Sequence, residues 1–308
     1  MTLAPPPQGA TRLADWGVIR ATGADSAQFL HGQLTQDIEH QDLGTARLAG
    51  YCSAKGRLLA TFVVWRRGPD EWLLACSADL LTAVLKRLSM FVLRAKCKLS
   101  DVSGEVPLWG IAGPASGLAD SDRIWAAVAR SAGELIRLPD AVPAGMPAVP
   151  RYLWAGDPAP ALPDLDPQAW RWLEVHSGVA RVVAATAEQF VPQMINLELV
   201  AGVDFQKGCY PGQEVVARSQ YRGTLKRRLF VVGSPAPLHP GQEVFHSADP
   251  EQPAGSVVLA GTLAGAGHAA LVSIKIAALE SGTLHADSAT GPQLLPGTLP
   301  YALSLEPG

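Results

Sequence analysis

Cysteine is scarce in this chain. Its 308 residues include four cysteines, at positions 52, 76, 97 and 209, and no two of them form a CxxC pair. This spacing excludes both a disulfide framework and a cysteine zinc site. The seven histidines are scattered and form no HxxH or HExxH motif. We therefore predict that the protein itself binds no metal.

Long apolar runs are also missing. No segment reaches the run of about 18 apolar residues that a membrane-spanning helix needs. Residues 1–9 are rich in proline and lack the charged start and apolar core of a secretory signal. The sequence therefore predicts a cytoplasmic protein with no membrane partner, and the unpaired cysteines fit that reducing compartment.

Neither sign of charge dominates. The chain has 25 Lys and Arg against 28 Asp and Glu, a net charge of −3. This balance gives no global reason to expect nucleic-acid binding, so direct tRNA contact is disfavoured. The basic run 226–228, with Arg222 close by, can in principle touch a phosphate. A solvated strand edge is the favoured interpretation.

The most informative segment is the octapeptide KGCYPGQE at residues 207–214. Pro211 predisposes the chain to turn, and Gly212 supplies the positive φ of a type II turn. The pattern predicts a helix over 213–221, with Gly223 as its left-handed C-terminal cap. A cysteine beside Lys207 and near a helix N-terminus is favoured as a reactive thiolate. On the residues alone, a small buried Cys209 in a tight turn is an equally good interpretation.

Strand-like and helix-like patterns alternate before the motif. Residues 139–168 are rich in proline and predict a long surface crossing with one short strand at 152–154. A helix should begin near Pro167, since proline is favoured at the first helical position. Before this crossing the predicted strands are 16–21, 58–65 and 72–76, the predicted helices start at Asp25 or Ser26 and cover 80–88, and 108–112 and 124–128 begin a second βα pattern.

From about residue 225 the texture changes to short β-like pieces separated by turn residues. This spacing predicts a small antiparallel barrel or sandwich. We therefore expect two regions, residues 1–224 and residues 225–308.

The cysteine motif resembles the signature of the YgfZ-type folate-binding proteins, relatives of the glycine-cleavage aminomethyltransferase. The resemblance implies an α+β fold, with an aminomethyltransferase-like folate-binding body of two interwoven α+β lobes and a C-terminal antiparallel β-barrel. Other segments that resemble the family are residues 15–16 (DW), 22–26 (TGADS), 32–37 (GQLTQD), 55–57 (KGR), 190–193 (FVPQ), 196–197 (NL), 202–203 (GV), 221–223 (YRG) and 299–301 (LPY).

The same resemblance implies a site for tetrahydrofolate or a related folate. Trp16 and Trp170 match the two tryptophans that line the folate channel of the family, although tryptophan is more often simple core on residue type alone. Gln193, Asn196 and Glu214 are further candidate contacts. Ordinary loop and cap hydrogen bonding is the alternative for these three.

One candidate position departs from the family. A glutamate is common two residues before the glycine that Gly178 matches, whereas this chain has His176. A neutral imidazole offers one hydrogen bond where a carboxylate offers a bidentate contact. We therefore expect altered or weaker folate binding, with a core histidine as the equal alternative.

A second departure concerns chemistry. Ala60 and Thr61 stand where the aminomethyltransferases carry an Asp-Asp pair. Neither side chain is a carboxylate acid or base, so aminomethyl transfer in the glycine-cleavage manner is not expected.

The resemblance instead implies a folate-dependent accessory protein that supports iron–sulfur enzymes, including those that modify tRNA. Cys209 would be its working thiol and Lys207 would tune the charge of that thiol. In the rest of the motif, Gly208 and Gly212 are expected to allow the backbone bend, Tyr210 to pack beside the turn, Gln213 to start the helix, and Arg218 to pair with Glu214. The alternatives are a tetrahydrofolate-dependent one-carbon transferase and a pure binding module with a structural Cys209.

Overall fold

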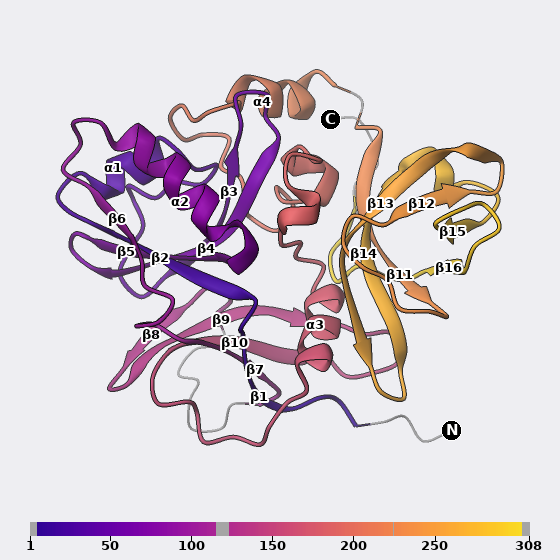
Figure 1. The fold of residues 1–308 in the computed structure, drawn as a ribbon, viewed down its shortest axis with the longest axis horizontal. Coiled ribbons are helices and arrows are strands. Elements are labelled where there is room, and N and C mark those ends of the chain that lie inside the picture. Colours follow the sequence, from indigo (N-terminus) through magenta and orange to yellow (C-terminus); the bar gives the residue numbers. More distant parts are fainter. Residues whose placement is uncertain (1–4, 115–122, 224, 304–308) are drawn as a thin grey trace.

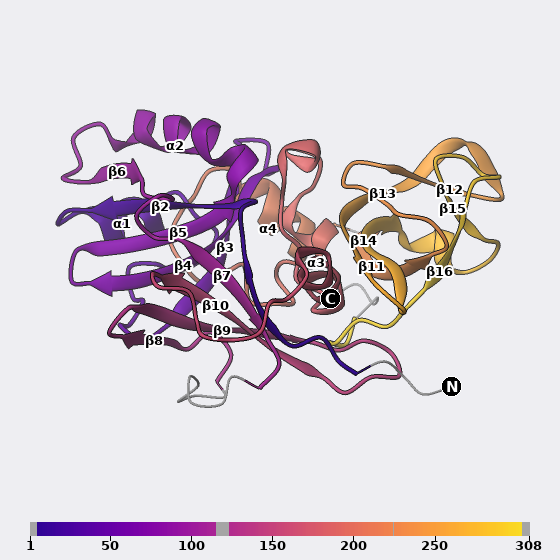
Figure 2. The same cartoon turned by 60° about the horizontal axis from the view of Figure 1, so that its bottom comes forward.

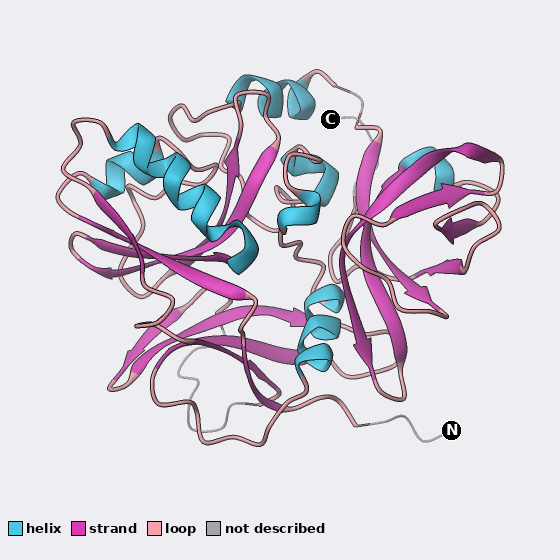
Figure 3. Ribbon diagram, in the orientation of Figure 1, coloured by secondary structure: helices cyan, strands magenta, loops and turns pink. Residues whose placement is uncertain are grey.

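The structure is a computed structural model that describes residues 5–114, 123–223 and 225–303. It contains two five-stranded sheets and one closed β-barrel, with few helices (Figures 1 and 3). The α+β fold with a C-terminal antiparallel barrel is therefore confirmed. No helix in these ranges is both long enough and apolar enough to cross a membrane.

The first sheet has the strand order β3-β4-β5-β2-β6, with antiparallel neighbours. The predicted strand at 58–65 forms most of β4 and is buried on both faces. Helix α2 covers the sheet with its apolar side, as the helical spacing predicts. The elements are β2 (Trp16–Thr22), α1 (Ser26–His31), β3 (Ala46–Cys52), β4 (Leu58–Gly68), β5 (Glu71–Ser77), α2 (Ala78–Val92) and β6 (Lys98–Asp101).

The second sheet has the order β1-β7-β10-β9-β8. Its strands are β1 (Gly9–Arg12), β7 (Leu108–Ala112), β8 (Ala127–Arg130), β9 (Gly133–Ala141) and β10 (Val149–Gly156). The predicted surface crossing is wrong here, because β10 is an almost wholly buried central strand. Pro150 is tolerated because the register with β9 shifts between Val149 and Arg151, where a missing N–H does least harm. The predicted second βα pattern is also wrong, since both of its segments lead into strands.

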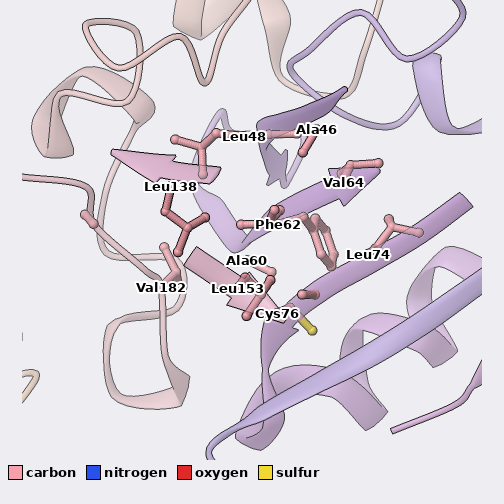
Figure 4. Close-up of a cluster of buried hydrophobic side chains, with 14 of the residues drawn as sticks. Ala46, Leu48, Ala60, Phe62, Val64, Leu74, Cys76, Leu138, Leu153 and Val182 are labelled. Carbon is pink, nitrogen blue, oxygen red and sulfur yellow. The ribbon is translucent and has the colours of Figure 1, made fainter. Parts of the chain in front are cut away.

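The two sheets share one core. Side chains of β4 and β5 meet side chains of β9 and β10, among them Phe62, Leu74, Leu138 and Leu153 (Figure 4). Figure 2 shows the second sheet stacked beneath the first. This face-to-face packing brings residues from both halves of the body to the same place.

Helix α3 (Pro167–His176) begins at the predicted proline and lies between the second sheet and the barrel (Figure 3). The Asp166 carboxylate caps it by accepting a hydrogen bond from the backbone N–H of Gln168 at 2.8 Å. The barrel approaches very closely: a Cβ at Gly261 would lie 2.2 Å from the backbone nitrogen of Trp172. Only glycine permits this contact, which fixes α3 against the barrel.

The barrel closes in the order β11-β14-β13-β12-β15-β16, with β16 pairing back to β11. Its interior is filled mainly by valine, leucine and isoleucine. The strands are β11 (Arg227–Ser234), β12 (Glu243–His246), β13 (Asp249–Leu263), β14 (Gly267–Lys275), β15 (Leu284–Ala286) and β16 (Gln293–Pro296), and the short helices are η1 (Ala184–Thr186), η2 (Pro192–Ile195), α4 (Gln213–Tyr221) and η3 (Ile276–Leu279).

Candidate functional site

The cysteine motif forms the predicted turn and helix. Gly212 has φ 79° and ψ 5°, and the N–H of Gln213 donates to the Tyr210 carbonyl at 3.2 Å. A Cβ at Gly212 would lie 2.4 Å from the Ser53 carbonyl oxygen, so glycine is required where the motif docks on the β3–β4 turn. The predicted cap at Gly223 is wrong, because α4 ends at Arg222 and Gly223 lies outside the positive-φ region.

Within the motif the thiol and the ammonium have opposite surroundings. Cys209 is exposed, whereas Lys207 is buried. The Lys207 Nζ donates to the carbonyls of His31 at 2.6 Å, Leu34 at 3.1 Å and Gly208 at 3.2 Å. Burial lowers the pKa of Lys207 to about 8, and the charge of Cys209 is among the groups that oppose the shift. Lys207 therefore fastens the motif to the end of α1 while its charge acts on the thiol.

Three further groups adjoin the thiol. Tyr210 is buried beneath the Lys207 ammonium, which lies 4.9 Å from its ring centre, and its hydroxyl has no partner among the described residues. A Cβ at Gly208 would lie 3.4 Å from Nε2 of His31. Nδ1 of His31 lies 2.9 Å from Oδ1 of Asp37. The sequence did not single out His31, because its position depends on α1 docking against a segment far along the chain.

The largest cavity lies elsewhere, between the start of β2, helix α3 and the barrel. Its volume is about 870 Å³, within the roughly 300–1,000 Å³ of typical small-molecule sites. Its wall includes charged side chains from three parts of the chain. The polar lining residues are Asp15, Ser77, Asp79, Gln168, Arg171, Glu174, Arg181, His239, Thr262 and His268.

A small cavity of about 40 Å³ adjoins it in the core between the two sheets. The two share Glu174 and Arg181 as walls, and Trp16 lines the small one. The Arg181 guanidinium carbon lies 4.7 Å from the Trp16 ring centre, and its nitrogens lie 2.9 Å from an Asp15 oxygen and 3.5 Å from a Glu174 oxygen. An aromatic face, a cation and a carboxylate therefore meet at the junction of the cavities.

Two buried donors face this junction without partners in the described part of the chain. Both the Trp16 Nε1 and the Arg151 Nη1 are buried and unpaired, and both residues line the small cavity. Burial lowers the pKa of Arg151 to about 10. Buried donors normally find an acceptor, so these two are suited to the carbonyl oxygen or ring nitrogen of a bound ligand.

The second predicted tryptophan lies in a different environment. Trp170 is 1% exposed and lines neither cavity. Arg151 lies 5.1 Å from its ring centre, and a Cβ at Gly110 would lie 2.6 Å from its ring. Trp170 is a core side chain, so we assign it no folate contact.

His176 also turns away from the cavities. Its ring lies 4.0 Å from the Trp172 ring, and burial lowers its pKa to about 4. Glu174, two residues earlier and nearly opposite on the helix, faces both cavities instead. The sequence interpretation missed Glu174 because it compared matching positions and not the faces of α3.

The three remaining candidates lie outside both cavities. Gln193 donates to the Val216 carbonyl at 2.9 Å, which joins η2 to α4. Asn196 donates to the Leu229 carbonyl at 3.0 Å and accepts from its N–H at 3.2 Å. Glu214 is exposed on α4 and, within the described ranges, forms no ion pair with Arg218. The hydrogen bonds of Gln193 and Asn196 hold loops in place.

The position of the missing carboxylates does reach the site. Thr61 lines the small cavity, and its hydroxyl accepts a hydrogen bond from the Val182 N–H at 3.1 Å. Ala60 is fully buried. No acid or base of the glycine-cleavage kind stands at these two positions.

The fold defines a class of protein. Aminomethyltransferase T of the glycine cleavage system from Bartonella henselae superposes with a TM-score of 0.71 over 95% of this chain and 85% of that chain, at 15% sequence identity. The chain therefore has the aminomethyltransferase fold. No family model matches it.

Curated relatives then identify the family within this class. A "tRNA-modifying protein YgfZ" from Edwardsiella ictaluri is 31% identical over 303 residues, which cover 90% of this chain and 86% of the relative. Proteins of the same name from Serratia proteamaculans and Colwellia psychrerythraea are 32% identical over 71% of this chain and 31% identical over 72%, respectively. The chain belongs to the YgfZ family.

Proposed function

We propose that this protein is a folate-binding accessory protein that supports tRNA modification. Its ligand is tetrahydrofolate or a related folate, and Cys209 is its working thiol. Iron–sulfur enzymes, including those that modify tRNA, are its proposed partners. The name of the relatives supports the tRNA part of the proposal. The cavity junction at Arg181 supports the folate part.

The residues at the junction fit a folate. A pterin is flat, carries amino and amide groups, and continues through an aromatic linker to a carboxylate tail. The Trp16 ring offers a face, Glu174 accepts from amino groups, and the unpaired nitrogens of Trp16 and Arg151 donate to ring acceptors. Arg171, on the wall of the large cavity, suits the tail.

The small cavity alone cannot hold a pterin, since its volume is about 40 Å³. The large cavity has room for the whole ligand, and its boundary with the small one is the pair Glu174 and Arg181. We therefore place the folate in the large cavity, with its polar ring edge toward this pair.

The thiol and the folate cavity are separate in this proposal. No residue of the segment 207–214 lines either cavity. The folate then acts as a ligand of the body, while Cys209 meets a partner at the surface. This division suits an accessory protein better than a one-carbon transferase, since Thr61 offers no acid or base to the ligand.

Complementation of a bacterial strain that lacks its own family member tests the proposal. Modified nucleosides of total tRNA are measured by mass spectrometry for the wild type, Cys209→Ala and Trp16→Ala. We expect the wild type to restore modification and both variants to fail while remaining folded. Full restoration by Cys209→Ala would remove the thiol from the function, and full restoration by both variants would overturn the proposal.

A further inference from the structure

Cationic side chains gather around helix α4 without carboxylate partners. Lys55 and Arg57 lie at the β3–β4 turn, and Arg218 and Arg222 lie on α4. Lys226 and Arg227 lie where the barrel begins. Among the described residues, none of these six cations has an ion pair within 4.0 Å. Arg228, the next residue in the chain, is by contrast buried and paired with Glu198.

Two of the arginines share a surface hollow. Arg57 and Arg227 both line a depression of about 490 Å³ between the body and the barrel. Burial, and then the neighbouring charge of Arg57, lowers the pKa of Arg227. Glu243 lies in the same hollow but pairs with neither arginine. Two half-buried guanidinium groups repel each other, and an anion between them would remove that cost.

A second hollow follows α4. It has a volume of about 500 Å³ and is lined by Glu214, Val215, Ala217, Arg218, Tyr221 and Arg222. The Tyr221 side chain is 65% exposed, with Phe205 behind it at a ring distance of 5.7 Å. An exposed aromatic ring between arginines is a typical stacking platform for a nucleic-acid base.

The two hollows meet at the β3–β4 turn. A Cβ at Gly56 would lie 2.8 Å from the Val215 Cβ, so this turn packs directly on α4. Arg57, the next residue, lines the other hollow. Figure 1 shows α4, the end of the β3–β4 hairpin and the start of β11 along the same upper edge of the molecule. The six cations and Tyr221 therefore form one surface, here called the α4 face.

We propose that the α4 face binds single-stranded or looped RNA, with a backbone phosphate between Arg57 and Arg227 and a base stacked on Tyr221. This inference rests on the proposed role in tRNA modification. The hollows hold two carboxylates, Glu214 and Glu243, against six cations on the face, although the chain as a whole carries a net charge of −3. The global charge balance therefore hides a locally basic surface.

Guanidinium pairs and an exposed ring favour RNA over an acidic protein. Arginine matches the planar, bidentate geometry of a phosphate oxygen pair, and unpaired bases of RNA stack on aromatic side chains. Cys209 is exposed and lies three residues before Gly212, which packs against Gly56 in this face. A bound RNA would therefore lie near the thiol.

Fluorescence anisotropy with a labelled unmodified tRNA and a labelled single-stranded oligoribonucleotide tests the proposal. The variants are Arg57→Gln/Arg227→Gln, Arg218→Gln/Arg222→Gln and Tyr221→Ala. The control, Lys86→Gln/Arg94→Gln, changes the charge equally at two exposed cations in and just after α2 that have no ion pair with a described residue. Circular dichroism and a tetrahydrofolate titration verify that each variant is folded.

We expect each arginine double variant to weaken RNA binding at least tenfold and Tyr221→Ala at least fivefold, with less than a twofold effect of the control. The slope of log affinity against log salt should become shallower by about 0.7 for each phosphate that a variant no longer neutralises. Absence of RNA binding, equally weakened binding in the control, or binding of inorganic phosphate alone would overturn the proposal. Unchanged folate affinity in these variants separates such a failure from a failure of the folate site.

Discussion

The Arg181 guanidinium lies 4.7 Å from the centre of the Trp16 ring and separates a core cavity from a much larger one. Asp15 and Glu174 hold it there from two different elements. Aromatic, cationic and anionic groups therefore converge at a single point with open volume beside it. A flat ligand that carries both donors and acceptors fits this combination.

Glu174 should contribute to folate affinity, and His176 should not. Glu174→Gln replaces a carboxylate that faces both cavities, and we expect at least a tenfold loss of tetrahydrofolate affinity by calorimetry. His176→Gln is the matched control, since that ring stacks on Trp172 and lines neither cavity. A loss with the His176 variant alone would place the folate contact at His176 and refute the assignment to Glu174.

Trp170 should matter for stability and not for the ligand. Its side chain is 1% exposed, so Trp170→Ala should lower the free energy of unfolding by about 3–5 kcal/mol. Trp170→Phe keeps most of the packing and should bind tetrahydrofolate as the wild type does. Urea unfolding and calorimetry measure the two effects. A folded Trp170→Phe variant that no longer binds folate would show that this ring belongs to the site.

The buried ring of His176 predicts a loss of stability in acid. Burial lowers its pKa from 6.5 to about 4. Between these values the unfolded chain binds a proton that the folded protein does not, so stability is full above pH 6.5 and falls as the pH approaches 4. At about 1.4 kcal/mol per pKa unit, the loss amounts to at most roughly 3 kcal/mol.

Urea unfolding of the wild type and His176→Gln between pH 7.5 and 4 isolates this contribution. The difference in unfolding free energy between the two proteins should change over this range, because the variant lacks the titrating ring. Parallel curves for both proteins would show that the acid sensitivity arises from other groups.

The four cysteines should differ sharply in reactivity. Cys209 is exposed, whereas burial raises the pKa of Cys52 and of Cys76 to about 12. Iodoacetamide should therefore label Cys209 first in the folded protein and reach the two buried thiols only in urea. Peptide mass spectrometry over time gives the order. Labelling of Cys52 before Cys209 would contradict the surface position of the motif.

Local patterns predicted the elements that local chemistry determines. Pro167 starts α3, the run 58–65 is a strand, and 213–221 is a helix, because spacing and turn residues fix these features within a few positions. The strand β10 was predicted wrongly because the prolines around it suggested a crossing, and only the register shift beside Pro150 accommodates the strand. The barrel followed from turn spacing and was confirmed.

The site was less predictable, because it is assembled from distant segments. The positions of Trp16 and Thr61 at the small cavity agree with their place in the sequence patterns. Arg181 and Glu174 carry no motif of their own, and their importance appears only when α3 meets the first sheet. The α4 face likewise joins three segments, and the net charge of the chain gives no sign of it.

A titration of the protein with tetrahydrofolate, followed by calorimetry and tryptophan fluorescence under anaerobic conditions, tests the central claim most directly. We predict saturable binding of one folate per chain, and at least a tenfold weaker affinity for Trp16→Ala at unchanged stability of the fold. Absence of saturable binding by the wild type, or equal affinity of the wild type and a folded Trp16→Ala variant, would contradict the proposed folate site.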